Sequence, residues 1–170
     1  MNFKVEGEKV RQHALDRLQV LNTPEEQAYD DITRLAADVC GTPIALISLT
    51  DNHRQWFKSR VGLQAREMPR ENSFCEHALK TPHCMLIIPD ASADERFNNH
   101  PLVTGDPKIR FYAGAPLLTR EGHMLGALCV VDTRPRELEA GQMADLQFMA
   151  QQVLVMLESR AASGQQIPLP

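Results

Sequence analysis

The chain has 170 residues, of which 43% are hydrophobic and 24% are charged, a composition typical of one soluble globular domain. Eighteen Lys and Arg against 22 Asp and Glu give a net charge of −4, so the chain lacks the positive field on which nucleic-acid binding relies. Its apolar runs are far shorter than the ~20 residues that span a bilayer, and its polar N-terminus shows no secretory signal. We therefore expect a cytoplasmic protein with no nucleic-acid partner and no membrane contact.

Four cysteines, Cys40, Cys75, Cys84 and Cys129, are spread along the chain without a CxxC pair. Such spacing suits a reducing compartment better than a disulfide framework. We expect no structural disulfide.

The N-terminal region, residues 1–22, carries apolar residues three and four apart between Glu8 and Leu21, which predicts an amphipathic helix. The segment Thr23 to Glu26 then combines an N-cap hydroxyl, a proline at the first helical position and a glutamate at the third. This capping box predicts that a second helix starts at Thr23, and Gly41 predicts its end.

The middle of the chain changes to strand and turn patterns. The apolar run Pro43 to Thr50 and the following stretch Arg54 to Arg60 predict a hairpin. Ser73 to Glu76 is a second capping pattern, which predicts a short helix. Cys84 to Ile88 is typical of a strand, and Pro89 to Pro107 is a long connection of the kind that often covers a site.

Two further strand-like runs, Arg110 to Leu118 and Met124 to Asp132, are joined by a short loop that contains a glycine, so we expect them to pair antiparallel. Gly114 and Gly126 fall inside these runs. A glycine within a strand usually marks a bulge or the close approach of another group, which predicts such a place at both positions.

From Glu139 onward the pattern is helical again. Apolar residues alternate three and four apart, which places them on the a and d positions of two heptads and predicts the contact of a homodimer. Docking of the same residues on the sheet is the alternative. The predicted dimer residues are Met143, Leu146, Ala150, Val153 and Leu157. Residues 161–170 lose the pattern, and we expect a frayed tail.

These elements predict an α+β fold, with helices at both ends and about five antiparallel strands covered on one side. Seven motifs then follow in a fixed order: Arg54-Gln-Trp-Phe-Lys58, Pro69-Arg-Glu-Asn-Ser-Phe-Cys-Glu-His77, Pro89-Asp-Ala, Asp94-Glu-Arg-Phe97, Pro101-Leu-Val-Thr-Gly105, Ile109-Arg-Phe-Tyr-Ala-Gly114 and Leu125-Gly-Ala-Leu-Cys-Val-Val-Asp132. In these motifs the chain resembles a GAF domain, of the bacterial type found before sensor histidine kinases and diguanylate cyclases.

The resemblance covers residues 23–160. It implies a PAS-like sheet of five or six strands, with the N- and C-terminal helices on one face and a ligand pocket on the other. It also implies a sensory role in signal transduction, in a two-component or similar system, with a kinase or cyclase as the output. That output is either a separate protein or a part of the same chain. Relatives bind cyclic nucleotides, bilins, haem, small metabolites or nothing, so the resemblance identifies no cofactor, and the ligand is an unidentified small molecule.

The candidate ligand-binding residues are polar or aromatic side chains embedded in apolar segments, because a pocket combines apolar walls with a few polar anchors. Strand alternation puts Arg110 and Tyr112 on one face and Phe111 on the other, so that the first two suit an anionic ligand. The alternative is that the aromatic residues are plain core and the pocket has collapsed. The candidates are Phe74, Cys75, His77, Phe97, Asn98, Asn99, Arg110 and Tyr112.

Two chemical alternatives start from Cys75. Zinc is disfavoured, because Cys75 and His77 are two apart on a helix and point away from each other, so we expect no metal. Cys75 and Cys84 approximate a cysteine pair of free methionine-(R)-sulfoxide reductases, which also resemble GAF domains. The long loop, however, lacks the cysteine that attacks the substrate in that family. We therefore predict that the chain is not an enzyme and has no catalytic residues, with a ligand-free dimerisation module as a further alternative.

Overall fold

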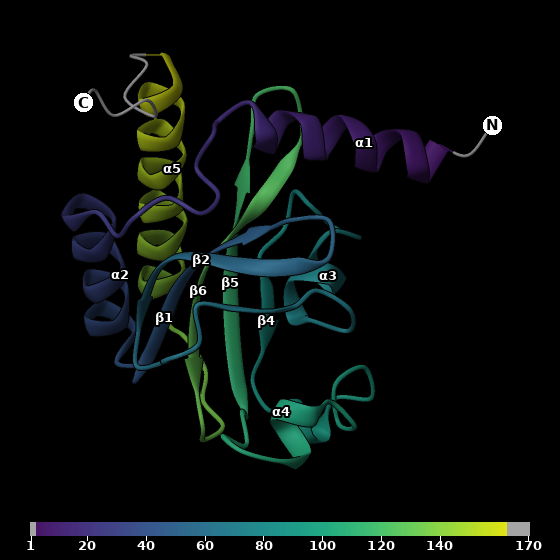
Figure 1. The fold of residues 1–170 in the computed structure, drawn as a ribbon. Helices are drawn as coiled ribbons and strands as arrows, with labels where there is room; N and C mark the ends of the chain where they lie inside the picture. Colours follow the sequence, from purple (N-terminus) through teal and green to yellow (C-terminus); the bar gives the residue numbers. More distant parts are fainter. Residues whose placement is uncertain (1–2, 163–170) are drawn as a thin grey trace.

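The computed structural model describes residues 3–162, and its strands form a single antiparallel sheet (Figure 1). The strand order is β3-β2-β1-β6-β5-β4, so β1 and β6 lie in the middle of the sheet and β3 and β4 form its edges. This arrangement confirms the predicted α+β class and both predicted hairpins. The strands are β1 (Ile44–Thr50), β2 (Arg54–Val61), β3 (Glu67–Pro69), β4 (Leu86–Ile88), β5 (Phe111–Leu118) and β6 (Met124–Asp132).

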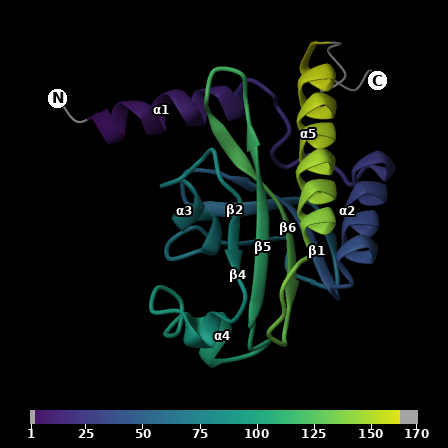
Figure 2. The same cartoon turned by 180° about the vertical axis from the view of Figure 1, so that it is seen from behind.

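Helices cover the two faces of the sheet unequally (Figure 2). The helices are α1 (Phe3–Asp16), α2 (Gln27–Cys40), α3 (Phe74–Ala78), α4 (Pro101–Thr104) and α5 (Ala140–Ala162), with a 3-10 turn η1 (Ala91–Ala93). The longer α2 and α5 lie side by side on one face, whereas α3 and α4 lie on the opposite side of the sheet. None of the helices within residues 3–162 combines the length and the apolarity that crossing a bilayer requires.

The sheet separates two apolar cores, because neighbouring side chains in a strand point to opposite faces. In β5, Phe111 and Ala113 belong to the core under α2 and α5, and Tyr112 belongs to the core under α3. In β1, Ile47 points to the first core and Leu46 to the second. All residues of β1 are therefore buried, as befits a central strand.

The N-terminal segment differs from the prediction. Helix α1 ends at Asp16, and α2 begins at Gln27 rather than at Thr23. The reason is the buried side chain of Lys58, which donates a hydrogen bond of 2.8 Å to the Thr23 hydroxyl. The hydroxyl in turn donates to the carbonyl of Val20, at 2.5 Å. A tertiary contact thus takes the group that a helix cap would use.

Gly126 lies where β6 runs close to β1. A Cβ at this position would lie 1.9 Å from the carbonyl oxygen of Ser48, well inside van der Waals contact. The predicted close approach within this strand is confirmed. Gly41 likewise ends α2 as predicted, in the left-handed conformation with a φ of 66°.

The structure corrects the predicted dimer contact on α5. Four of its five residues pack in the first core, so they are not available to a second chain; they are Leu146, Ala150, Val153 and Leu157, each at most 2% exposed. Met143 is half-buried. The three-and-four spacing marks the face that docks on the sheet, and the same helix exposes Phe148 and Val155 on another face, at 62% and 56%.

The predicted tail, residues 161–170, is placed only in part. Ala161 and Ala162 continue α5, and residues 163–170 lie outside the described residues. At the other end, residues 1–2 of the predicted N-terminal region also lie outside them. The division into residues 1–22, 23–160 and 161–170 stays a prediction.

Candidate functional site

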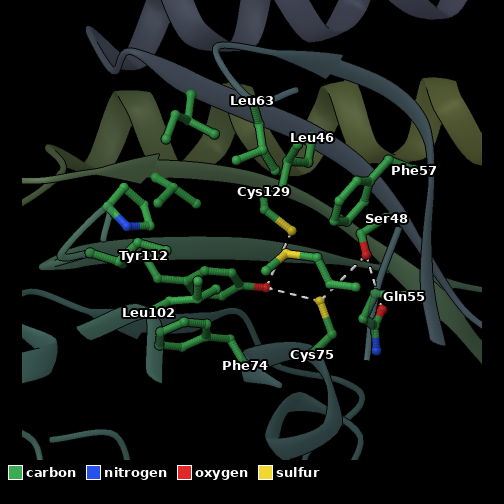
Figure 3. Close-up of a pocket in the computed structure, with 15 residues that line it drawn as sticks. Leu46, Ser48, Gln55, Phe57, Leu63, Phe74, Cys75, Leu102, Tyr112 and Cys129 are labelled. Atoms are coloured by element: carbon green, nitrogen blue, oxygen red, sulfur yellow. Dashed lines mark hydrogen bonds between the residues drawn. The ribbon is translucent and has the colours of Figure 1, made fainter. Parts of the chain in front are cut away.

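A cavity of about 80 Å³ lies between the sheet and the segments that cover its second face (Figure 3). Strands β1, β2, β5 and β6 form its floor, and α3 with the segment 102–109 covers it. Its wall is apolar except at one end. The lining residues are Ile44, Leu46, Ser48, Gln55, Phe57, Leu63, Met68, Phe74, Cys75, Leu102, Pro107, Ile109, Tyr112, Cys129 and Val131.

Helix α3 supplies two of these residues. The Ser73 side chain caps it by accepting a hydrogen bond of 3.0 Å from the backbone N–H of Glu76, as the capping pattern predicted. The first two helical residues, Phe74 and Cys75, are then buried toward the sheet. The ring of Phe74 stacks on that of Tyr112, with 4.9 Å between centroids, so α3 is held over the cavity by an aromatic contact.

Tyr112 enters the cavity from β5. Gly114 lies two positions further along the same face, and a Cβ there would be 2.6 Å from the Tyr112 hydroxyl. The glycine therefore provides the space in which the hydroxyl reaches the polar end of the cavity. This is the second close approach that the sequence predicted.

Two thiols and two hydroxyls form the polar end of the cavity (Figure 3). The Tyr112 hydroxyl lies 3.4 Å from Sγ of Cys75 and 3.2 Å from Sγ of Cys129. Cys75 also donates a longer hydrogen bond, of 3.8 Å, to the hydroxyl of Ser48. All four residues are at most 5% exposed, so these groups depend on protein partners rather than on solvent for hydrogen bonds.

The proton affinities of the three acidic groups diverge. Hydrogen bonding with Cys129, and to a smaller extent with Tyr112 and Ser48, lowers the pKa of the Cys75 thiol to about 7 and outweighs its burial, which raises the pKa. The hydrogen bond with Cys75, together with burial, raises the pKa of Cys129 well above its usual value. Burial also raises the pKa of Tyr112 well above its usual value, followed by the nearby cysteines. Cys75 is therefore the group that ionises first.

A chain of hydrogen bonds leads away from this polar end. Ser48 donates to the side-chain oxygen of Gln55 at 2.9 Å, and Thr50 donates to the same oxygen at 3.0 Å. The amide nitrogen of Gln55 donates to the hydroxyl of Ser73, the cap of α3, at 3.2 Å. Strands β1 and β2 and helix α3 thus share one buried polar connection.

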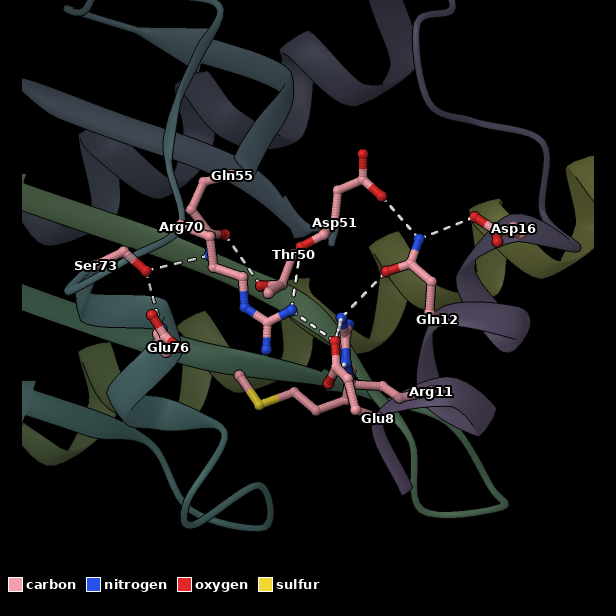
Figure 4. A network of polar contacts seen from close by, with 11 residues as sticks. Glu8, Arg11, Gln12, Asp16, Thr50, Asp51, Gln55, Arg70, Ser73 and Glu76 are labelled. Atoms are coloured by element: carbon pink, nitrogen blue, oxygen red, sulfur yellow. Dashed lines mark hydrogen bonds and ion pairs between the residues drawn. The ribbon is translucent and has the colours of Figure 1, made fainter. Parts of the chain in front are cut away.

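A second network holds α1 against the domain next to this connection (Figure 4). Glu8 accepts hydrogen bonds from Arg11 at 2.9 Å and from Arg70 at 2.6 Å. Gln12 donates to the carboxylate of Asp51, the residue that follows β1, at 2.7 Å. Burial raises the pKa of Glu8, but the two arginines outweigh it and lower the pKa to about 2. Charged contacts rather than an apolar seam therefore attach α1 at this place.

Only three of the predicted ligand residues, Phe74, Cys75 and Tyr112, line the cavity. Phe97 is core at 1% exposed, and His77 meets its ring edge-on, at 4.7 Å between centroids.

The remaining three predicted residues also lie away from the cavity. Asn98 and Asn99 are exposed. Arg110 precedes β5, so strand alternation does not extend to it, and its guanidinium donates to the backbone carbonyls of Val103 in α4 and of Ile109. Arg110 is therefore not among the residues that line the cavity, which corrects its predicted place as an anchor for an anionic ligand there.

The sequence reasoning missed Ser48, Gln55 and Cys129. Each lies in a strand beside apolar neighbours. Ser48 carried a signal that sequence reasoning could have used: it is a polar residue within an apolar run, and a buried hydroxyl needs a hydrogen-bond partner. Cys129 passes for a small core residue in sequence, and only the pairing of β5 with β6 places it beside Tyr112.

The two cysteines of the reductase alternative lie in different environments. Cys84 is exposed, whereas Cys75 is buried, with its sulfur 3.4 Å from the Tyr112 hydroxyl. Within residues 3–162, no group of three or more His, Cys, Asp or Glu side chains could hold a metal ion.

The domain is thus an α+β sheet with a lined cavity on one face and long helices on the other. The sequence profile of the GAF domain matches residues 24–157. The chain therefore belongs to the GAF domain family, a sensory and regulatory family.

One relative in sequence and two solved structures are similar to this chain. A cyclic di-GMP phosphodiesterase of Pseudomonas aeruginosa is 41% identical over 155 residues, which cover 91% of this chain and 26% of that protein. The GAF domain of a phosphoenolpyruvate-protein phosphotransferase from Coxiella burnetii has a TM-score of 0.68 at 12% identity, over 96% of this chain and 99% of that one. A type II free methionine-R-sulfoxide reductase from Thermoplasma acidophilum has a TM-score of 0.63 at 11% identity, over 78% and 91%. The two structural matches show a shared fold.

The first of these relatives corrects the prediction that the chain is not an enzyme. That relative is named as a phosphodiesterase, and the chain spans about a quarter of its length. The prediction is overturned because the GAF domain of this chain is of a type that occurs within an enzyme.

Proposed function

We propose that this GAF domain binds a small, largely apolar molecule in its cavity and regulates cyclic di-GMP hydrolysis as part of a larger protein. The apolar cavity with polar groups at one end supports the binding role, since such a cavity selects a compact ligand with one hydrogen-bonding group. The identity to the P. aeruginosa phosphodiesterase supports the choice of reaction.

The polar connections of β1 support a route from the cavity to the N-terminal helix. Ser48 lies at the cavity, Thr50 shares a hydrogen-bond acceptor with it, and Asp51 contacts α1 through Gln12. A ligand that changes the partners of Ser48 therefore acts three residues away from Asp51, where α1 is attached. Its effect on the output is limited to its differential affinity for two arrangements of the helix, typically ~1–3 kcal/mol.

The exposed face of α5 supports the proposal that the domain acts as a homodimer. Phe148 and Val155 are seven residues apart, so they lie on one side of a helix about 34 Å long. Large exposed apolar side chains on one side of a long helix are a typical site of contact between copies. These residues replace the buried ones that the sequence pattern suggested.

A chimeric enzyme tests the regulatory role. The matching quarter of the P. aeruginosa phosphodiesterase is replaced by this chain, and cyclic di-GMP hydrolysis is measured with and without Leu63→Trp, which fills the cavity at a half-buried lining position. The matched control is Leu154→Trp, at a half-buried position outside the cavity. We expect Leu63→Trp to change the rate about fivefold or more and the control to leave it unchanged. Equal rates for all three would contradict the proposal.

Two measurements on the chain itself complete the test. Native mass spectrometry of gently purified protein is expected to detect a bound small molecule that Leu63→Trp removes. Sedimentation of Phe148→Glu with Val155→Glu is expected to give a monomer, with Val10→Glu, at another exposed apolar position, as the control. The ligand-free dimerisation module would be favoured by two results together: a dimer with no bound ligand, and a chimera whose rate of hydrolysis does not respond to Leu63→Trp.

A further inference from the structure

Two cysteines from distant parts of the chain meet at the polar end of the cavity. Cys75 comes from α3 and Cys129 from β6, and both thiols contact the hydroxyl of Tyr112. The two sulfur atoms lie 3.4 Å and 3.2 Å from that one hydroxyl. Thiols that share one neighbouring atom are near enough for one to react with the oxidised form of the other after a small side-chain movement.

The two thiols differ in a way that assigns them different roles. The thiolate is the reactive form of cysteine, and Cys75, with a pKa lowered to about 7, is partly ionised at neutral pH. Cys129 has a raised pKa and remains a thiol. Cys75 is therefore suited to attack an oxidant, and Cys129 is suited to react with the product.

The cavity restricts which oxidant reaches the pair. Cys75 and Cys129 are 5% and 1% exposed, so a bulky reagent cannot touch either sulfur from outside. Among the lining residues, Leu63, Met68, Leu102 and Pro107 are partly or fully exposed, so the cavity meets the surface between the segments 63–68 and 102–107. A volume of about 80 Å³ has room for a few water-sized molecules, so it admits hydrogen peroxide and is too small for a tripeptide thiol such as glutathione.

We propose that Cys75 and Cys129 form an oxidation site for hydrogen peroxide, which converts the two thiols to a disulfide between α3 and β6. The Cys75 thiolate attacks one peroxide oxygen, so that an S–O bond forms, the O–O bond breaks, and hydroxide leaves and takes up a proton to become water. Sulfur is oxidised to sulfenic acid, and peroxide is reduced. The Cys129 sulfur then attacks Cys75, an S–S bond forms, and the hydroxyl leaves with the Cys129 proton as a second water.

The disulfide has a structural consequence that goes beyond the proposed ligand binding and does not depend on it. It joins the helix that covers the cavity to a central strand, and it removes the thiol that donates to Ser48. The hydrogen-bond chain toward Gln55 then loses its first member. Oxidation and an apolar ligand would thus act on the same polar end of the cavity.

Peroxide treatment of the reduced chain tests the site. After oxidation, free thiols are alkylated under denaturing conditions, and the peptides are mapped by mass spectrometry. We expect a peptide pair that joins Cys75 to Cys129, has lost the mass of two hydrogen atoms and disappears on reduction. Exposed Cys84 and buried Cys40 are internal controls within the same chain. Full alkylation of both Cys75 and Cys129 after treatment, with oxidation confined to Cys84, would overturn the proposal.

Variants separate the two roles. Cys129→Ser is expected to accumulate a sulfenic acid at Cys75 that dimedone traps when the oxidised chain is unfolded in its presence, and Cys75→Ser is expected to lose the cross-link and the trapped product. Cys84→Ser, the matched control, retains the cross-link. Dimedone labelling at Cys129 in the absence of Cys75 would reverse the assignment and overturn it.

Two measurements on the unaltered chain keep the test independent of how the variants fold. The rate of cross-linking is expected to rise with pH and to reach half its maximum near pH 7, following the ionisation of Cys75. Oxidised glutathione is expected to modify Cys84 and to leave Cys75 unmodified. A rate that does not respond to pH between 6 and 8, or a mixed disulfide on Cys75, would contradict the proposed site, whereas ligand binding in the cavity would be unaffected by either result.

Discussion

Replacing Leu157 by alanine tests which face of α5 carries the stability of the domain. Leu157 is fully buried in the core between α5 and the sheet, and Phe148 on the same helix is 62% exposed. A buried leucine truncated to alanine loses its apolar transfer energy and leaves a cavity, at a cost of about 3 kcal/mol. For a chain of this length that loss lowers the melting temperature by roughly 6–12 °C. Phe148→Ala is expected to change the stability of the monomer by about 0.5 kcal/mol or less.

Urea and thermal unfolding, followed by circular dichroism at a low and a high chain concentration, distinguish these cases. We expect Leu157→Ala to be destabilised equally at both concentrations, because its contacts lie within one chain. Phe148→Ala is expected to remove only the dependence of the melting temperature on concentration. If Leu157→Ala cost no more than Phe148→Ala at the low concentration, the docking of α5 through Leu157 would be wrong.

Three further predictions concern other parts of the fold. Gly126→Ala forces a Cβ against the carbonyl of Ser48 and is expected to cost more than about 3 kcal/mol in urea unfolding, so a near-neutral result would contradict the observed pairing of β1 with β6. The pKa of Glu8 is lowered from 4.5 to about 2, so its contribution, on the order of 1 kcal/mol after solvent screening, is present above pH 4.5 and lost as the pH falls toward 2. Glu8→Gln should therefore be less stable than the natural chain at pH 6 and nearly equal to it at pH 2, and an unchanged difference would refute the charged attachment of α1. Lys58→Met leaves the carboxylate of Glu26 without its closest cation and is expected to cost about 3 kcal/mol, measured in the same way, whereas a gain in stability would show that the pair opposes folding.

The attachment of α1 and the oxidation site concern the same strand, β1. Ser48 in its middle contacts Cys75, and Asp51 directly after its end contacts α1. Under our proposal, a change in the hydrogen bonds of Ser48 is passed to the attachment of α1 along this buried strand rather than through a loop. Strand β1 is wholly buried and pairs on both sides, which makes it suited to transmit a displacement.

Local patterns in the sequence were sufficient for most of the sheet and for the helix beside the cavity. Runs of apolar and β-branched residues bounded by turn formers predicted the two hairpins, because strand formation depends on neighbours close in the chain. The Ser73 cap of α3 and the left-handed Gly41 were also predictable, since both depend on a few adjacent residues. Gly126 predicted a close approach but not which strand makes it.

Tertiary contacts decided the rest. Lys58, 35 positions from Thr23, takes the hydroxyl that was predicted to start a helix, and no local pattern encodes such a contact. The spacing on α5 is the same for docking on a sheet and for a coiled coil, so only the packed sheet showed which one holds. The site followed the same rule: Cys75 and Cys129 are far apart in sequence, and it is the sheet pairing and the placement of α3 that bring both thiols to one tyrosine. The sequence by itself determined most of the elements of this GAF domain, though not β3 or α4, because propensity, capping and turn chemistry are local. The chemistry of its cavity arises from contacts that exist only after the sheet and helices have packed.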